Sequence, residues 1–258
     1  MRRTSDNAEA NVLFDPASNP RRVTLDSPVV ITGGSSAATT LGELVAAVGF
    51  ADVDSLGAPD SAALATGANQ TGGTNATQAT AGAQPLVVDA GVLVEGLRFA
   101  GGQFLRSVPS NLIVPPFTVA AWFRPSEVFG LAGDSYRIYS RIASSDASRG
   151  FISIEDSKIC MNGSSGGSSD IVGGAVNVNT WYFVHGFYMP TSCQLFLDLV
   201  SQGSAAVTLS ATDTTPIAIG SRGASDRFFK GDIPFVDIWP RALSAEEIAT
   251  VRDLTDPR

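Results

Sequence analysis

From about residue 92 to the C-terminus, apolar and polar residues alternate with a period of two, which is the pattern of β-strands. The clearest strand is Phe117–Arg124, which lies between Pro115-Pro116 and Pro125. Odd-numbered and even-numbered residues of this strand are both apolar or small. Its two faces are therefore both expected to be covered, and Trp122 is expected to lie in a core. Further strand-like segments, separated by turns rich in Gly, Ser, Asn and Pro, are Tyr136–Ile142, Phe151–Ile154, Trp181–Tyr188, Cys193–Leu199, Ile217–Gly220 and Phe228–Trp239. Strands at this spacing predict an all-β fold, a two-sheet antiparallel sandwich.

Helical signals are confined to two short segments. Ser244 and Glu247 have the spacing of a capping box, which predicts one short helix near the C-terminus. Thr40–Val48 carries Leu and Val at helical spacing, and a helix so short must dock on another surface. The residues before it contain only two short β-like pieces, split by Pro28. We therefore predict an irregular N-terminal arm over residues 1–40.

Acidic charge is concentrated in one part of the chain. Residues 23–97 contain seven carboxylates and no Lys or Arg. Gly, Ala, Ser and Thr dominate from Gly33 to Gln84, and such a composition buries little apolar area per residue. We expect an acidic, small-residue-rich and partly irregular segment over 41–91, ordered against its own sandwich or a neighbouring subunit. The sandwich domain itself is expected over 92–258.

Composition excludes several function classes. A net charge of −8 lacks the basic footprint of nucleic-acid binders, so no nucleic-acid partner is expected. The single histidine disfavours His-based catalysis and catalytic zinc. Neither cysteine lies in a zinc-ligand spacing, and no segment has the apolar length of a membrane span. No apolar run follows Arg2 and Arg3 as in a signal peptide, so we expect synthesis in a cytoplasm.

Several segments together carry a family resemblance. They are Phe117–Pro125, Trp181–Val184 with Leu195–Asp198, and the tail Ile217–Arg222, Phe229–Ile233 and Arg241–Ile248. Over roughly residues 92–258 the chain resembles the laminin-G-like, concanavalin-A-like jelly-roll family. Asn75–Pro85 is similar to a stretch that precedes such domains in bacteriophage structural proteins, although Gly67–Gly73 replaces the usual Trp and Asp turn, which shapes a ligand site. The resemblance implies a jelly roll that binds carbohydrate or protein, sometimes with calcium, and that decorates phage virions or serves in adsorption.

The same fold hosts glycosidases, so the chemistry of the residues decides whether an enzyme is expected. Such hydrolases need two carboxylates facing one cleft, as in a Glu-x-Asp-x-Glu run, and the sequence has no such run. Glu155 and Asp156 are adjacent, so they would point to opposite strand faces. Asp52 and Asp54 are two residues apart and would share one face of a strand, but they lie outside the expected sandwich. We therefore predict no catalytic residues.

Loops offer the binding candidates. The Gly/Ser-rich loop from Asn162 to Asp170 is a candidate binding tip or a passive connector, and Asp226 lies in another such turn. Calcium would need several converging oxygens. Turn aspartates available for this are Asp134, Asp170, Asp213 and Asp226. No ligand spacing links them, so a turn-forming role is favoured and no cofactor is predicted.

Three further side chains have alternative interpretations. His185 alternates with aromatic residues on one strand face, which favours a partly buried and hydrogen-bonded strand residue over a pH-sensitive group or a ligand contact. Cys160 and Cys193 each lie in a strand-like segment. Cytoplasmic synthesis favours buried thiols over a cross-strand disulfide.

Taken together, these features predict a non-enzymatic bacteriophage virion structural protein, a capsid decoration, fibre or tail component, on the virion surface. Arg2, Arg3, Arg21 and Arg22 are the candidate assembly residues, contacting other virion proteins or the acidic segment of a neighbour. We expect a homo-oligomer, with a trimer favoured, and an outward domain that contacts a host-surface glycan. A bacterial carbohydrate-binding module or adhesin is the alternative, and a glycoside hydrolase comes third.

Overall fold

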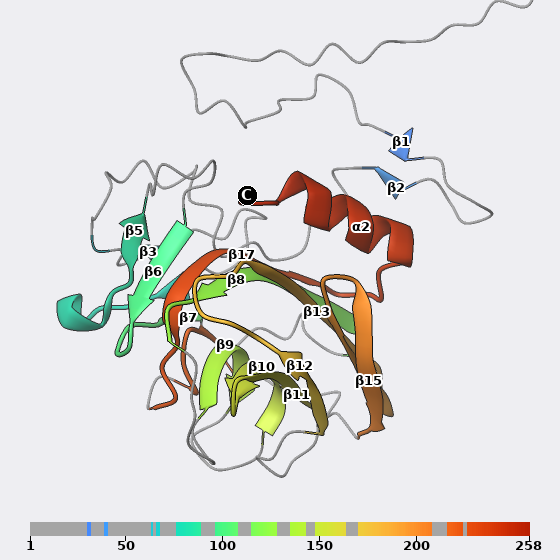
Figure 1. Ribbon diagram of the computed structural model, residues 1–258, viewed down its shortest axis with the longest axis horizontal. Coiled ribbons are helices and arrows are strands. Elements are labelled where there is room, and N and C mark those ends of the chain that lie inside the picture. Colours follow the sequence, from blue (N-terminus) through green and yellow to red (C-terminus); the bar gives the residue numbers. More distant parts are fainter. Residues whose placement is uncertain are drawn as a thin grey trace, which may run out of the picture.

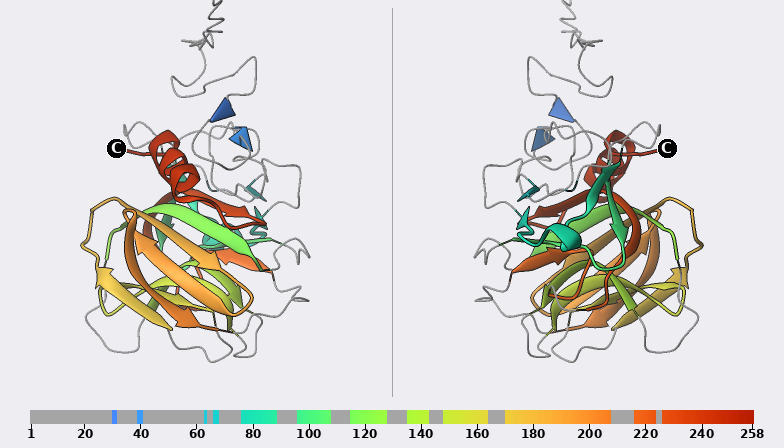
Figure 2. Two further views of the ribbon diagram at one scale, coloured as in Figure 1. Left: turned by 90° about the vertical axis from the view of Figure 1, so that its right-hand side faces the viewer. Right: turned by 90° about the vertical axis from the view of Figure 1, so that its left-hand side faces the viewer.

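The computed structural model describes residues 30–31, 39–40, 63, 66–67, 76–88, 96–107, 115–127, 135–142, 148–163, 170–207, 216–223 and 226–258. Two antiparallel sheets lie face to face, and the helix α2 (Ala245–Leu254) lies outside one of them (Figures 1 and 2). This arrangement confirms the predicted all-β jelly-roll sandwich with a short C-terminal helix. No helix in the described ranges has the length and apolar content needed to cross a membrane.

One sheet has seven strands within the described residues, in the order β15-β14-β13-β8-β17-β6-β5. Their bounds are β5 (Leu86–Val88), β6 (Gly96–Ala100), β8 (Phe117–Pro125), β13 (Tyr182–Tyr188), β14 (Ser192–Leu197), β15 (Val200–Ala206) and β17 (Lys230–Trp239). The long strands β13, β8 and β17 pair side by side, with Val184 opposite Ala121 and Ala121 opposite Val236. These three strands form the rigid centre of the sheet.

The facing sheet has eight strands within the described residues, in the order β12-β11-β10-β9-β16-β7-β4-β3. Their bounds are β3 (Thr66–Gly67), β4 (Ala76–Thr77), β7 (Leu105–Ser107), β9 (Ser135–Ile142), β10 (Ser148–Glu155), β11 (Lys158–Asn162), β12 (Ile171–Ala175) and β16 (Ile217–Ile219). The turn Asp156–Ser157 joins β10 to β11, and both of its residues have positive φ, at 47° and 61°. This is the backbone of a type I′ hairpin, so Asp156 lies in the turn and not on a strand face.

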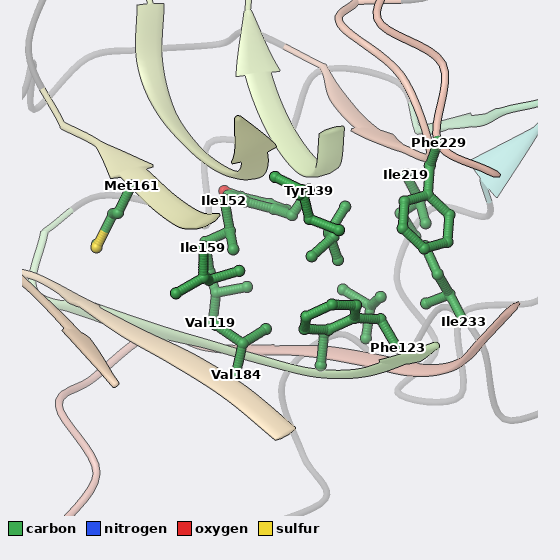
Figure 3. Close-up of a cluster of buried hydrophobic side chains, with 14 of the residues drawn as sticks. Val119, Phe123, Tyr139, Ile152, Ile159, Met161, Val184, Ile219, Phe229 and Ile233 are labelled. Atoms are coloured by element: carbon green, nitrogen blue, oxygen red, sulfur yellow. The ribbon is translucent and has the colours of Figure 1, made fainter. Parts of the chain in front are cut away.

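The main core lies between the two sheets (Figure 3). Val119 and Phe123 from β8 face Ile152 from β10 and Ile159 from β11, and all four side chains are fully buried. The intervening residues of each strand point outward, as the period of two predicts. The alternation seen in the sequence therefore selects the face of each strand that enters the core.

A second core covers the outer face of the seven-stranded sheet. Trp122, Phe183 and Trp239 project from β8, β13 and β17 and pack against Ile248 and Val251 of α2. Ser244 caps the helix: its side chain accepts the Glu247 N–H, and the Glu247 carboxylate accepts the Ser244 N–H. The capping box is confirmed. Because this helix covers the second face of β8, the strand is buried on both sides, and the predicted burial of Trp122 is confirmed.

The sheets extend before residue 92. β5 pairs with β6, and β4 pairs with β7, so residues 76–88 lie on their own sandwich, one of the two locations expected for the acidic segment. Ahead of them, β1 (Val30–Ile31) pairs with β2 (Thr39–Thr40). Residues 41–48 of the other helix candidate lie outside the described residues. The domain division at residues 40 and 91 stays a prediction.

Candidate functional site

Polar side chains are buried on the outer face of the eight-stranded sheet. Ser153 of β10 is paired with Arg137 of β9 and with Cys160 of β11. Paired residues point to the same face of a sheet, and the neighbours Ile152 and Ile154 occupy the inner face, so this row points outward. All three of its side chains are at most 1% exposed. A buried polar row outside the main core calls for hydrogen-bonding partners.

Arg137 is at the centre of this face. Its guanidinium carbon lies 3.2 Å from the centroid of the Phe151 ring, and its Nη1 donates to Glu155 Oε1 at 3.1 Å. Burial lowers the pKa of Arg137 to about 9, and the nearby Glu155 carboxylate opposes this shift. The residue is 0% exposed, and its Nε finds no hydrogen-bond acceptor among the described residues.

Two more arginines lie beside Arg137, on the segment that joins β16 to β17. The Arg137 N–H donates to the Arg227 carbonyl oxygen at 3.1 Å, and Arg227 Nη1 donates to Ser135 Oγ at 2.7 Å. Arg222 forms a two-point ion pair with Asp226. The positive charges of Arg227 and Arg222 both lower the pKa of Arg137, because nearby like charges disfavour its protonated form.

We call this cluster the arginine face; it comprises Ser135, Arg137, Phe151, Ser153, Glu155, Arg222, Asp226 and Arg227. It presents three guanidinium groups against two carboxylates, and both carboxylates accept hydrogen bonds from an arginine. A hydrolase of this fold class would instead direct two carboxyl groups at one substrate bond. The chemistry that the arginine face supports is binding through multiple donors to oxygen-rich ligands.

The three predicted loop residues do not lie together on an exposed tip: Asp226 belongs to the arginine face, whereas Asn162 and Asp170 flank the loop that follows β11. Asn162 is the last residue of β11, paired with Phe151, and is fully buried. Asp170 closes the base of the loop, because its Oδ2 accepts the Gly163 N–H at 2.7 Å. Asp226 is engaged by Arg222. Residues 164–169 of the loop lie outside the described ranges, and so do Arg2, Arg3, Arg21 and Arg22, the candidate assembly residues.

The calcium candidates are only partly visible. Asp134 and Asp213 lie outside the described residues, and Asp170 and Asp226 have the separate partners given above. In the described part of the chain, no group of three or more His, Cys, Asp or Glu side chains is placed to hold a metal ion. The structure therefore offers no described ligand set on which to build a metal site.

His185 and the cysteines are structural. His185 is 3% exposed and stacks on Phe196 with ring centroids 4.5 Å apart. Its burial on the strand is confirmed, but its Nδ1 has no hydrogen-bond partner among the described residues, so the expected hydrogen bond is not found at that atom. Cys160 and Cys193 are free, buried thiols. Burial raises the pKa of Cys193 to about 11, so its reactive thiolate is disfavoured.

Sequence reasoning did not select Arg137, Glu155, Arg222 or Arg227. A weak signal was present, because Ser135-x-Arg137 and Ser153-x-Glu155 place polar residues at a period of two between apolar ones. That pattern predicts a polar outer face but not its burial. Arg222 and Arg227 lie about 85 residues further along the chain than Arg137 and reach it only through the sheet pairing of β9 with β16.

Comparisons with known proteins agree with this fold. Residues 100–249 match the sequence model of the concanavalin A-like lectin/glucanases superfamily. Trypanosoma rangeli sialidase is similar in structure, with a TM-score of 0.59 and 14% identity, over 87% of this chain and 35% of the sialidase. Domain 4 of AbnA, a GH43 extracellular arabinanase from Geobacillus stearothermophilus in complex with arabinotriose, matches with a TM-score of 0.55 and 16% identity, over 81% of this chain and 98% of that domain.

The two kinds of comparison differ in what they support. At these identities the solved structures show the fold alone, and the chain spans only about a third of the sialidase length. None of the curated protein sequences matches the chain. The matched segment, residues 100–249 of 258, makes up more than half of the sequence. The chain therefore belongs to the concanavalin A-like lectin/glucanases superfamily.

Proposed function

We propose that this chain is a non-enzymatic glycan-binding protein and that the arginine face contacts the sugar. The observation that carries the proposal is that Arg222 and Arg227, both only half-buried, lie beside the buried guanidinium of Arg137. The half-buried guanidinium groups are the donors that a ligand can reach. Arg137 adds a fixed positive charge behind them.

The surrounding geometry fits a hydroxyl-rich ligand. Phe151 and Glu155 hold the Arg137 guanidinium in one orientation. Arg227 Nη1 donates a hydrogen bond to Ser135 Oγ. Strands β9 and β10 carry the residues that orient Arg137 and Arg227, so these orienting groups lie on regular secondary structure. Donors fixed in advance by a rigid scaffold lose less entropy on binding.

Domain 4 of AbnA supports a binding role by analogy of fold. That domain is matched over 98% of its length, and its structure holds arabinotriose. The sialidases are matched over 35% of theirs or less, so their activity does not carry over. The absence of a Glu-x-Asp-x-Glu run and the engagement of Glu155 and Asp226 by arginines favour binding over hydrolysis.

Arg227→Asn tests the binding face. Arg227 has a φ of 55°, which asparagine tolerates, so the fold should persist while a guanidinium is removed. We expect about tenfold weaker binding, the loss of one charge-assisted hydrogen bond. The measurement is binding to an immobilised panel of bacterial-surface glycans that includes arabinotriose and sialic acid.

Arg252→Gln is the matched control for this experiment, because Arg252 lies on α2, over the other sheet. It should bind every glycan of the panel as the unmodified chain does. Binding of no glycan by the unmodified chain, or equal losses in the two variants, would contradict the proposal.

The biological setting favoured by the sequence is the surface of a bacteriophage virion. Asn75–Pro85 resembles a segment of phage structural proteins, and residues 23–97 carry seven carboxylates without a cation. Such a segment is suited to contacts with arginines of other subunits. We propose that residues 1–40 attach the protein to other virion proteins and that it assembles as a homo-oligomer, with a trimer favoured.

Deletion of residues 1–35 tests this setting. The sandwich described above does not include those residues, so the truncated protein should remain soluble with its β-sheet circular dichroism intact. We expect it to be lost from purified particles and to show a lower oligomer mass by light scattering. Normal incorporation of the truncated protein would show that the N-terminal residues are not the attachment element.

A further inference from the structure

Arg227 differs from the other two arginines of the arginine face in its partners. Arg137 is paired with Glu155, and Arg222 is paired with Asp226. The half-buried Arg227 forms no ion pair with any described carboxylate, and its side chain donates to a neutral group, Ser135 Oγ, at 2.7 Å. Arg227 therefore brings to the face a positive charge that no described carboxylate balances.

This charge lies beside a second, fully buried cation. The Arg137 N–H donates to the Arg227 carbonyl oxygen at 3.1 Å, and Arg137 forms a β-bridge with the next residue, Phe228. Burial lowers the pKa of Arg137 most, and the positive charge of Arg227 lowers it further. The two guanidinium groups thus repel each other in a place where water screens them poorly.

The backbone holds Arg227 in this unfavourable position. Its φ of 55° lies in the left-handed region, which residues with a β-carbon adopt uncommonly. The turn directly before it is closed by the Arg222 N–H, which donates to the Asp226 carbonyl oxygen at 2.9 Å. Left-handed residues other than glycine are concentrated at ligand-binding positions, and a half-buried guanidinium in such a turn is accessible to a ligand.

The carboxylates nearest to Arg227 are engaged elsewhere. Glu155 Oε1 accepts hydrogen bonds from Arg137 Nη1 and from Ser153 Oγ, both at 3.1 Å. Asp226 forms its two-point ion pair with Arg222. At the hairpin next to Glu155, Asp156 and Lys158 are both exposed and opposite in sign. The charge that is left for a ligand to balance is the charge of Arg227.

We infer that the glycan bound by the arginine face is acidic, with a carboxylate or sulfate group on the sugar that binds the Arg227 guanidinium. This inference rests on the proposed glycan-binding role of the face and specifies its ligand class. A guanidinium presents parallel N–H donors in a fork that matches two oxygen atoms of one such group. The anion would pair with Arg227 and would also weaken its repulsion with Arg137.

The charge of the whole protein acts in the opposite direction. The chain has a net charge of −8, so its long-range field disfavours the approach of an anion. A preference for acidic sugars would therefore report the local positive charge of the arginine face and not a general attraction to the protein.

Pairs of sugars that differ only in charge test the inference. The probes are sialyllactose and its methyl ester, trigalacturonate and its methyl ester, and lactose with and without a sulfate group. Affinities are measured at constant ionic strength from the NMR shifts of the Ser135 and Phe228 amides. The charged member of a pair should bind about tenfold more tightly than the neutral member, the effect of one charge-assisted hydrogen bond.

The sugar pairs also distinguish the two possible anions. A preference within the carboxylate pairs would identify a sugar acid, and a preference within the lactose pair would identify a sulfated sugar; either result supports the inference.

Arg227→Asn should remove this preference. Its affinity for the charged sugar should fall about tenfold, and its affinity for the neutral partner should stay unchanged. Arg252→Gln removes the same charge from α2, over the other sheet, and should keep the preference. Circular dichroism should show the same β-sheet spectrum for both variants.

Equal affinities within every pair, or no binding of any charged probe, would overturn the inference. An equal loss for the charged and the neutral member in Arg227→Asn would overturn it as well. Binding of glycans without a preference for acids would still support the arginine face as a glycan-binding surface. The failure of this inference and the failure of the proposed function are therefore distinguishable.

Discussion

Trp122→Ala should lower the free energy of unfolding by about 3–5 kcal/mol, the range for deleting a buried large aromatic side chain. Trp122 is 0% exposed and packs between the outer face of β8 and helix α2, 5.4 Å from the Phe183 ring centroid. Its Nε1 donates to Thr255 Oγ1 at 3.1 Å, and the Arg258 guanidinium lies 4.9 Å from its ring. The substitution therefore removes the contact that fastens the C-terminal helix and tail to the sheet.

Urea denaturation followed by circular dichroism measures this loss. Trp181→Ala is the matched control, because Trp181 is half-buried on the same face and its removal should destabilise the protein by only about 1 kcal/mol. A loss below about 1 kcal/mol for Trp122→Ala would mean that α2 does not depend on the indole for its docking.

Stability should fall by about 2 kcal/mol between pH 7 and pH 5 because of His185 alone. Burial lowers the pKa of His185 from 6.5 to about 4 in the folded protein. Its ring stacks on Phe196 and lies against Phe187, and its Nδ1 has no hydrogen-bond partner among the described residues. Burial is the one cause of this shift, and no charged group among the described residues opposes it.

The direction of the change follows from where the proton binds. Above about pH 6.5 the histidine is neutral in both states and the stability is complete. As the pH falls toward 4, the unfolded chain binds a proton that the folded chain excludes, so the unfolded state is favoured. The loss levels off below pH 4, near a total of about 3 kcal/mol.

His185→Phe provides the control, because a phenyl ring can keep the stack on Phe196 but cannot bind a proton. His185 is the single histidine of the chain, so the variant should show a flat stability profile between pH 5 and pH 7 in urea melts. A wild-type profile without a slope in that interval, or a slope that persists in the variant, would show that His185 is solvated in the folded state.

Several elements were predictable because their causes are local. In Phe117–Arg124, odd-numbered and even-numbered positions are both apolar or small. This pattern is expected of a strand that is covered on both faces, and β8 is such a strand. The Ser244 and Glu247 spacing is sufficient for a capping box whatever the helix packs against. The spacing of apolar residues and local hydrogen bonds determine these features. They can therefore be predicted from the sequence alone.

Other strands have no local signal. β15 reads Val-Ser-Gln-Gly-Ser-Ala-Ala, and β12 reads Ile-Val-Gly-Gly-Ala. Both are edge strands of their sheets, and most of their residues are Gly, Ser or Ala, which have little β-propensity of their own. They are extended because β14 and β11 offer backbone partners, and β-propensity depends on such context. The two-residue strands β3 and β4 and the three-residue strand β5 are too short to show a period of two, so they escaped prediction.

The sequence by itself determined the fold class, the strands of the sandwich centre and the capped C-terminal helix, because hydrophobic alternation and capping act over a few residues. Only the tertiary structure decided the candidate site. Arg137 meets Arg222 and Arg227 through pairings between strands far apart in the chain. From the sequence alone, an arginine is expected to be a solvated surface residue. The contacts that bury or orient these arginines could not be predicted, because they exist only after the sheets have formed.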